Sequence, residues 1–194
     1  SSDVCSSDLI MLAVFDGIEH DTITDDANVD ALLKQMITVS SNEAANGLLS
    51  RIGNGDGKAA IATVTATAQR YGFTSSEELR TLTGMASGNA VENWTSTRDC
   101  GSFLSQVYAG TLVSKNASER MMQLLLGQTR RTKIPAGVPS GVKVANKTGE
   151  LAAVQNDVAI VFGTHPYVLA VMSSDISSAV APSQITELSR AVWD

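Results

Sequence analysis

The sequence predicts an α+β fold, in which a mostly helical lobe precedes an antiparallel sheet and a C-terminal helix. Between residues 10 and 126, apolar side chains recur at helical spacing and are separated by polar or glycine-containing segments. After Gly127 the pattern changes to a Pro- and Gly-rich segment and then to short apolar runs. Helical spacing returns from Pro182 to Trp193. A block of helices followed by strands is typical of the α+β class.

Helices are expected where apolar residues share one face, and several have recognisable start or stop signals. Gly53 and Gly72 end two of them, and Ser96 or Thr95 can cap a third. The expected helices cover residues 10–20, 29–37, 44–52, 59–70, 98–109, 117–126 and 182–193. Strands are expected over residues 142–148, 157–162 and 167–172. The segment from Phe73 to Asn93 reads as a long loop, and long loops in compact domains are often functional.

Composition excludes several classes of protein. A chain of 194 residues with 43% hydrophobic and 18% charged residues suits one globular domain. The net charge of −6 argues against a nucleic-acid partner, because there is no surplus of Lys and Arg to neutralise phosphates. No apolar run reaches the length of a membrane span. His20 and His165 stand alone in the sequence and form no metal-binding pattern.

The first nine residues differ from the rest. Ser1 to Leu9 has no helical or strand periodicity, and its back-translation matches a common sequencing-library adapter. We interpret residues 1–9 as a non-native scar and residues 10–194 as a partial domain. Its helical lobe covers about 10–130, and its sheet and terminal helix cover about 140–194. A disordered natural terminus is the alternative. Without this head Cys100 has no partner, so no disulfide is expected.

The segment Ser40-Ser41-Asn42-Glu43 opens an alanine-rich helix. Ser40 and Glu43 have the spacing of a capping box, which satisfies exposed backbone donors at a helix start. A helix N-terminus also presents hydroxyl and amide groups to anions. Both interpretations can hold together.

A second motif, Lys147-Thr148-Gly149, lies on the first expected strand. It places an ammonium group, a hydroxyl group and a closely approachable backbone side by side. Such a trio could bind a substrate carboxylate and leave the next amide, that of Glu150, free to donate to an oxyanion. A strand with one exposed lysine is the alternative.

Ser-x-Asn at a helix start followed 107 residues later by Lys-Thr-Gly on a strand is more specific than either motif alone. The pair resembles two of three signatures of the serine β-lactamase and penicillin-binding protein superfamily. The segments MITVSSNEAANGLL, ENWTSTRD and NKTGELAAVQNDVAIVFG resemble class A β-lactamase-like serine hydrolases. The likeness runs from about Ile10 to Asp194 and implies a β-lactamase/transpeptidase-like fold, here without its N-terminal helix and strands.

The resemblance implies a role for each matching residue. Ser40 would relay protons between Lys147 and the leaving nitrogen of the substrate, and Lys147 would support that relay. Asn42 would bind the amide side chain of the substrate, and Thr148, next to Gly149, would hold the substrate carboxylate. The backbone N–H of Glu150 would be an oxyanion donor.

Two departures from the family pattern concern single positions. Ser41 stands where class A enzymes usually have Asp, which affects loop packing more than chemistry. The Glu-x-x-Leu-Asn pattern, which supplies a water-activating carboxylate, is absent. Glu77, Glu78 and Glu92 are the nearby glutamates, and each is expected to be a solvated surface residue. Deacylation by one of them, or by none, remains open.

The third departure is the largest, because the Ser-x-x-Lys that supplies the nucleophile and its lysine base is missing. The family motif lies just ahead of the helix that begins at Ile10, where the adapter-like head stands. The one Ser-x-x-Lys in the chain is Ser140 to Lys143, in a segment that enters a strand, where residues three apart point to opposite faces. It is interpreted as a chance match. Arg130 and Arg131 could add positive charge near a substrate carboxylate, but a solvated pair is expected.

The sequence therefore predicts a truncated class A-like serine β-lactamase that hydrolyses β-lactam antibiotics through a serine acyl-enzyme, and that is inactive in this form. A penicillin-binding D-Ala-D-Ala carboxypeptidase or transpeptidase and a non-catalytic binding module are the alternatives. No metal or cofactor is expected. The expected partner is a β-lactam or a peptidoglycan stem peptide, and the expected protein is an extracytoplasmic monomer.

Overall fold

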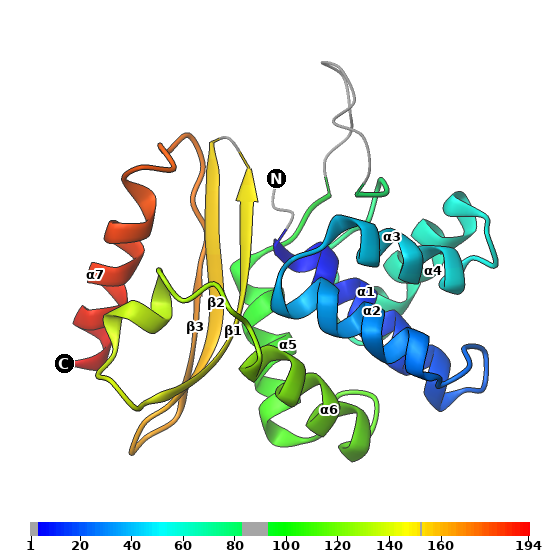
Figure 1. Cartoon of the computed structure of the whole chain (residues 1–194), viewed down its shortest axis with the longest axis horizontal. Coiled ribbons are helices and arrows are strands. Elements are labelled where there is room, and N and C mark those ends of the chain that lie inside the picture. Colours follow the sequence, from blue (N-terminus) through cyan, green and yellow to red (C-terminus); the bar gives the residue numbers. More distant parts are fainter. Residues whose placement is uncertain (1–3, 83–92, 152) are drawn as a thin grey trace.

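The computed structural model describes residues 4–82, 93–151 and 153–194. The helical lobe holds six helices of this described part and the sheet holds three strands, followed by a last helix (Figure 1). The elements are α1 (Val4–Glu19), α2 (Ala27–Thr38), α3 (Asn42–Ile52), α4 (Gly57–Arg70), α5 (Thr97–Ala109), α6 (Lys115–Leu126), a 3-10 turn η1 (Ile134–Gly137), β1 (Lys143–Leu151), β2 (Val154–Phe162), β3 (Tyr167–Val171) and α7 (Ala181–Trp193).

The architecture is a sheet between two helical layers. The strands are antiparallel in the order β1-β2-β3, and Lys147 on β1 lies opposite Val158 on β2. Helices α1, α5 and α6 contact one face of the sheet, whereas α7 and η1 cover the other. Figure 1 shows α7 and the short turn η1 on one side of the sheet and helices α1 to α6 on the other. This arrangement confirms the α+β class.

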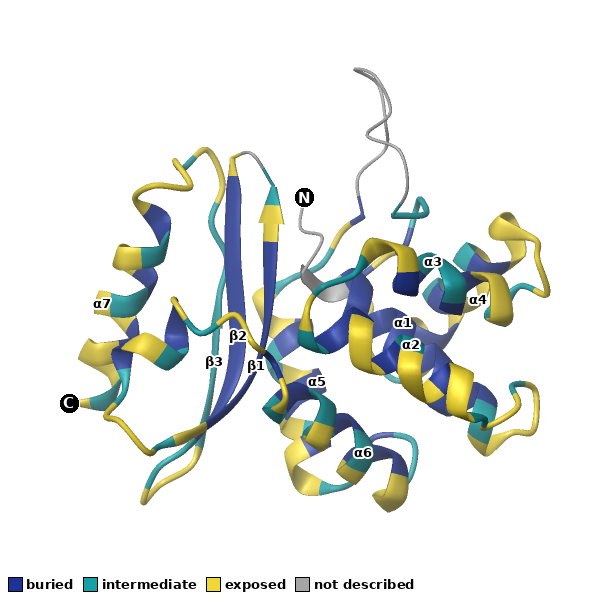
Figure 2. Ribbon diagram, in the orientation of Figure 1, coloured by how far each residue is buried: buried dark blue, intermediate teal, exposed yellow. Residues whose placement is uncertain are grey.

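Two apolar clusters follow from the alternation of side chains along the strands. The larger one joins α1 to α6 and includes Ala145 of β1. The smaller one, with Val144 and Val161, lies beneath α7. Figure 2 shows β1 and β2 as mostly buried, β3 as intermediate and the outer sides of the helices as exposed. Because Ala145 faces the helical lobe, Lys147 two residues later faces the same lobe.

Helix boundaries follow the local capping chemistry. Ser96 caps α5 by accepting from Asp99 N, and Gly110 ends it in the left-handed conformation. Asp56 caps α4 three residues before the expected start, and Ser114 caps α6 in the same way. The expected helices and strands are confirmed, with shifts of up to three residues at their ends, except that α1 begins six residues before the expected start at Ile10.

The N-terminal segment participates in the fold, although its sequence gave no reason to expect this. Helix α1 begins at Val4, and Ser6, Ser7, Asp8 and Leu9 are buried. The expectation that Cys100 forms no disulfide is wrong, because Cys100 is disulfide-bonded. That expectation rested on leaving residues 1–9 out of the fold.

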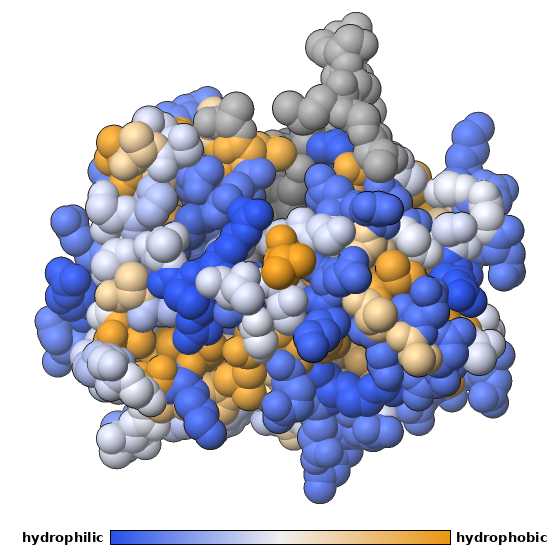
Figure 3. Space-filling view, viewed as in Figure 1, coloured by the Kyte–Doolittle hydropathy of each residue, from blue (hydrophilic) through white to orange (hydrophobic). Residues whose placement is uncertain are grey.

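On the face that Figure 3 presents, hydrophilic groups cover most of the area and hydrophobic ones form smaller patches. Within the described residues, no helix is long and apolar enough to cross a membrane.

Candidate active site

Ser40 lies in the three-residue connection between α2 and α3 and has an unusual backbone conformation. Its φ is +58°, in the left-handed region that few non-glycine residues adopt. Ser41, not Ser40, caps α3, because Ser41 Oγ accepts from Ala44 N at 3.1 Å. The expected capping box of Ser40 and Glu43 is therefore wrong. Since the cap is made by the next residue, the hydroxyl of Ser40 is available for another partner.

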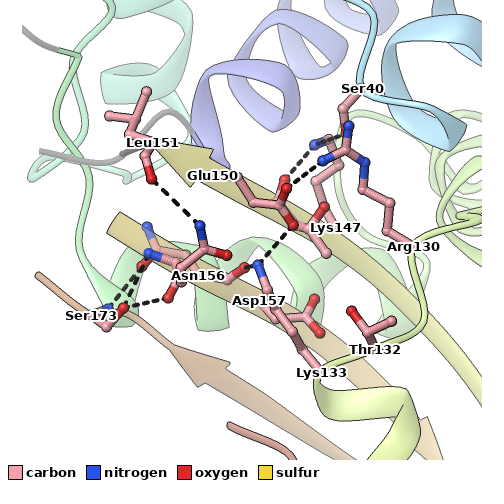
Figure 4. Close-up of polar contacts among 12 residues, drawn as sticks. Ser40, Arg130, Thr132, Lys133, Lys147, Glu150, Leu151, Asn156, Asp157 and Ser173 are labelled. Carbon is pink, nitrogen blue, oxygen red and sulfur yellow. Dashed lines mark hydrogen bonds and ion pairs between the residues drawn. The ribbon is translucent and has the colours of Figure 1, made fainter. Parts of the chain in front are cut away.

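That partner is Lys147 of β1. Lys147 Nζ donates to Ser40 Oγ at 3.0 Å and to its neighbour's carbonyl, Thr148 O, at 2.6 Å. The two residues are 107 positions apart, and the side chain of Lys147 points from the strand to the start of α3 (Figure 4). Burial lowers the pKa of Lys147 to about 8. Near neutral pH, the pair can therefore pass a proton between an amine and a hydroxyl group.

The other residues that the sequence singled out lie around this pair. Thr148 is 2% exposed, and its Oγ1 is buried without a hydrogen-bond partner in the described part of the chain. Gly149 is buried beside it, and Asn42 is the exposed first residue of α3. Thr148 follows Lys147 directly and Asn42 lies two residues after Ser40, so both flank the pair along the chain, and Thr148 Oγ1 is unused among the described residues.

Glu150 has a side-chain role that sequence reasoning missed. Its Oε2 accepts from Arg130 Nη1 at 2.5 Å, and its Oε1 accepts from Lys133 Nζ at 3.0 Å (Figure 4). Arg130 and Arg131 are consequently not a solvated pair, because Arg131 donates to the carbonyl of Val144 and to Asn146 Oδ1. The sequence offered no signal for Lys133, a single lysine two residues before Pro135.

A second polar network fixes the segment from Arg130 to η1 against the sheet. Asp157 Oδ1 accepts from Asn146 Nδ2 at 2.9 Å, and its Oδ2 accepts from Ile134 N at 2.9 Å. Burial raises the pKa of Asp157 to about 7, against these two hydrogen bonds, which lower it. The network positions β1, and with it Lys147, relative to the segment that carries Arg130.

Of the three glutamates considered from the sequence, Glu78 is not a surface residue. It is 1% exposed, and its Oε1 accepts from Asn93 Nδ2 at 2.9 Å. Asn93 Nδ2 also donates to Ser6 Oγ of α1 at 2.8 Å. Glu77 is exposed, as expected, and Glu92 lies outside the described residues. Glu78 is buried because Asn93 bonds it and also bonds Ser6 of α1, which holds the loop against that helix. The residues next to Glu78 in the sequence give no sign of either contact.

Asp8 of α1 adds a second buried carboxyl group. It is 2% exposed, and neither oxygen has a hydrogen-bond partner among the described residues. Burial raises the pKa of Asp8 to about 7, and the positive charge of Lys147 opposes that shift. The same interaction raises the pKa of Lys147 against its burial. Asp8 is therefore electrostatically coupled to the Ser40–Lys147 pair.

The side chains of this site can transfer a proton, through Ser40 and Lys147, and can bind an anion, through Thr148 Oγ1. In the part of the chain that the structure describes, no three His, Cys, Asp or Glu side chains are grouped so that they could hold a metal ion. The Ser140-x-x-Lys143 segment provides no serine–lysine pair at this site, since both of its ends are exposed where β1 begins.

Comparisons with solved structures place this geometry in a known fold. A β-lactamase from Sphaerobacter thermophilus superposes with a TM-score of 0.85 at 20% identity, over 98% of this chain and 81% of that one. An ancestral class A β-lactamase of Gram-negative bacteria gives 0.80 at 21% identity, over 98% and 83%. A mutant of PBP-A, solved as an acyl-enzyme complex with penicillin G, gives 0.80 at 20% identity, over 99% and 79%. The TM-scores show a shared fold, and at these low identities they show the fold alone.

The sequence comparison identifies the family. No curated protein sequence matches the chain. A family model described as the β-lactamase enzyme family matches residues 11–194, which is nearly the whole chain and includes Ser40, Lys147 and every residue between them. The protein therefore belongs to the β-lactamase enzyme family.

Proposed function

We propose that this chain is the larger part of a class A-like serine β-lactamase, which opens β-lactams through a serine acyl-enzyme. The observation that carries the proposal is the 3.0 Å hydrogen bond from Lys147 Nζ to Ser40 Oγ. It joins two motifs that are distant in sequence, inside a fold shared with β-lactamases.

In this proposal Ser40 relays a proton from Lys147 to the nitrogen that leaves when the lactam ring opens. Lys147, with its pKa lowered to about 8, can exchange a proton near neutral pH. Asn42 binds the amide side chain of the substrate, and the unused Oγ1 of Thr148 binds its carboxylate. The backbone N–H of Glu150, next to Gly149, donates to the oxyanion.

Deacylation needs a carboxylate that activates water, and Glu78 is the best candidate of the three glutamates. It is buried, and its hydrogen bond from Asn93 orients the carboxyl group. If Glu78 serves in this way, the acyl-enzyme is released quickly and the enzyme is a lactamase. The similarity to PBP-A supports the second candidate, a penicillin-binding D-Ala-D-Ala peptidase, in which the acyl-enzyme persists.

The chain itself is expected to turn over nothing, because it contains no Ser-x-x-Lys on a helix. Without an acylating serine, the Ser40–Lys147 pair has no covalent intermediate to act on. Measurable nitrocefin hydrolysis by the purified chain would contradict this.

The experiment that tests the function uses a parent protein in which a Ser-x-x-Lys precedes Ile10. Nitrocefin hydrolysis identifies a lactamase, whereas lasting labelling by fluorescent penicillin identifies a peptidase. Ser40→Ala in that parent should lower kcat by about a hundredfold or more, because proton transfer to the leaving group is lost. Ser50→Ala, an exposed position on α3, is the matched control and should leave kcat unchanged. Equal activity of both variants would reject the proposed relay.

The substrates of the family also suggest the setting in which such a protein acts. β-Lactams and peptidoglycan stem peptides are encountered outside the cytoplasmic membrane, so we propose an extracytoplasmic, monomeric enzyme. Fractionation of the native host with an antibody to this chain would test the location, and analytical ultracentrifugation would test the monomer.

A further inference from the structure

A groove separate from the candidate active site runs between α2 and α6 and reaches α1. Its volume is about 590 Å³, which lies within the range of small-molecule pockets. Neither Ser40 nor Lys147 lines it. The lining residues on which the following argument depends are Phe15, Lys34, Thr38, Arg120, Leu124 and Gly127.

The wall of the groove is mainly apolar, although most of its residues are polar or charged. Phe15 is 2% exposed and belongs to the large apolar cluster, and Leu124 packs against the same cluster. The aliphatic stems of the long polar side chains supply the rest of the apolar wall, while their charged ends stay in water. The groove therefore suits a ligand with an apolar body and places charged groups at its rim.

Arg120 forms part of one wall, and carboxylates already balance its charge. Its guanidinium group lies 4.9 Å from the centre of the Phe15 ring and donates to both oxygens of Asp25, at 3.0 and 2.8 Å. Arg120 Nη2 also donates to Asp30 Oδ1 at 2.8 Å. We call these two carboxylates and the guanidinium group the Arg120 cluster. The cluster engages Asp30, which lies one helical turn before Lys34 on α2.

Lys34 is the cation that remains at the rim. It is exposed on the α2 side of the groove, and among the described residues its ammonium group makes no hydrogen bond or ion pair. Glu119 on the α6 side is 3.9 Å from Lys115 of its own helix. The Arg120 cluster carries one negative charge in excess. The rim can therefore accept one anionic group beside Lys34, and it repels a second.

One end of the groove lies at the connection that leads to Ser40. Thr38 and Gly127 line this end, and a Cβ at Gly127 would lie 3.1 Å from Thr38 Cγ2. The carbonyl oxygen of Thr38 accepts from Thr129 N at 3.0 Å and from Thr129 Oγ1 at 2.9 Å. A ligand that fills the groove thus contacts the residue two positions before Ser40.

We propose that this groove binds an amphiphile with an elongated apolar body and a single carboxylate. The carboxylate lies at Lys34, and the apolar body lies along Phe15 and Leu124. The α2 side of the groove extends from Asp30 to Thr38, about 12 Å along the helix, which is long enough for an alkyl chain. The site goes beyond the proposed function and does not depend on it, because the groove contains neither member of the proposed proton relay.

Decanoate is the probe, and isothermal titration calorimetry measures its binding to the purified chain. Across butanoate, hexanoate, octanoate and decanoate, each added CH₂ should raise the affinity by up to about fourfold, until the chain outgrows the groove. Acetate has only the head group and 1-decanol only the body, so both should bind more weakly than decanoate. Nuclear magnetic resonance titration locates the ligand through the Leu124 methyl groups and the Gly127 amide.

Lys34→Met tests the head-group contact, because it removes the charge and keeps an unbranched apolar stem. Its affinity for decanoate should fall by about fivefold, whereas its affinity for 1-decanol should stay unchanged. Lys58→Met, at an exposed position of α4 that does not line the groove, is the matched control and should change neither affinity.

Leu124→Asn tests the apolar wall and should weaken the binding of both decanoate and 1-decanol by about tenfold. Leu188→Asn, at a position of α7 that is 46% exposed, is the control and should weaken neither. If Leu124→Asn fails to fold, Lys34→Met decides the question, since the Lys34 side chain is exposed.

Three results would overturn the inference. The first is an equal affinity of the unmodified chain and Lys34→Met for decanoate. The second is tighter binding of decyltrimethylammonium, which carries the opposite charge, than of decanoate. The third is a set of chemical-shift changes that excludes Leu124 and Gly127, because the amphiphile would then lie elsewhere. None of these results bears on the β-lactam function, which is tested at Ser40.

Discussion

Thr129 is bonded twice to the carbonyl oxygen of Thr38, through its backbone N at 3.0 Å and its Oγ1 at 2.9 Å. Thr38 is the last residue of α2, two positions before Ser40, and Thr129 immediately precedes Arg130. Gln128 Nε2 adds a hydrogen bond to Ile37 O at 2.7 Å. The end of α2 and the segment after α6 are therefore tied together where both reach the candidate active site, and this tie holds Ser40 and Arg130 near each other.

Thr129→Val should weaken that tie without removing it. The valine keeps the backbone hydrogen bond and loses the one from Oγ1, so the free energy of unfolding should fall by about 1 kcal/mol. Urea denaturation followed by circular dichroism measures the change. Thr63→Val, at an exposed position of α4, is the control, and an equal loss in both variants would contradict the role of the hydrogen bond.

Ser41→Ala should destabilise α3, because Ser41 Oγ caps Ala44 N. Loss of an N-cap hydroxyl typically lowers the free energy of unfolding by about 1 kcal/mol. Ser50→Ala on the exposed side of the same helix should be neutral or slightly stabilising, since alanine is the better helix former. If Ser50→Ala and Ser41→Ala behave alike in thermal denaturation, the capping assignment is incorrect.

The stability of the chain should depend on Asp8 between pH 4 and 7. The folded-state pKa of Asp8 is raised to about 7 from 3.8, so the folded state binds the proton more tightly than the unfolded state does. The stabilisation is complete below the unfolded pKa and is lost as the pH rises to the folded pKa, a loss on the order of 4 kcal/mol.

Asp8→Asn isolates this contribution, because an amide does not titrate and the buried Asp157 remains in both proteins. Urea unfolding measures the free energy of unfolding of both proteins at pH 4.5 and pH 7.5. Relative to the unmodified chain, Asp8→Asn should be more stable at pH 7.5 than at pH 4.5. Parallel pH profiles for the two proteins would show that Asp8 does not titrate in this range.

Gly137→Ala should destabilise the contact between η1 and α7. A Cβ at this position would lie 2.5 Å from both Ser189 Cβ and Thr186 O of α7, so one element must move. Overpacking of this kind costs about 1–3 kcal/mol. Gly101→Ala is the matched control: a Cβ there meets nothing within 4 Å, and alanine inside α5 should stabilise by about 0.5–1 kcal/mol. Scanning calorimetry should therefore show shifts of opposite sign in the melting temperatures.

Most of the secondary structure could be predicted from local pattern, because periodicity and caps are properties of short segments. The helix over residues 98–109 and its cap at Ser96 are examples, as are the strands around Lys147 and Val158. The errors arose where a local signal had two readings. Ser40 and Ser41 are both acceptable caps for α3. The tie between Thr38 and Thr129 and the contact with Lys147 favour Ser41 as the cap, and the hydroxyl of Ser40 then accepts from Lys147.

The burial of Glu78 could not be predicted for a related reason. A glutamate in a polar loop is normally solvated, and its environment here is made by Asn93 and by Ser6 of α1, which are distant in sequence. The same holds for Glu150, whose two cations come from the segment before η1. Hydrogen bonds between side chains far apart in the chain leave no periodic signal in the sequence.

By itself, the sequence determined the α+β class, the two motifs and the family they resemble, because these depend on residue types at fixed local spacing. Only the tertiary structure decided that Lys147 donates to Ser40, that Glu78 is buried and that Glu150 holds Arg130 and Lys133. Those relationships depend on how α1, α3 and the sheet pack together, since burial shifts the pKa values of these groups and packing selects their partners.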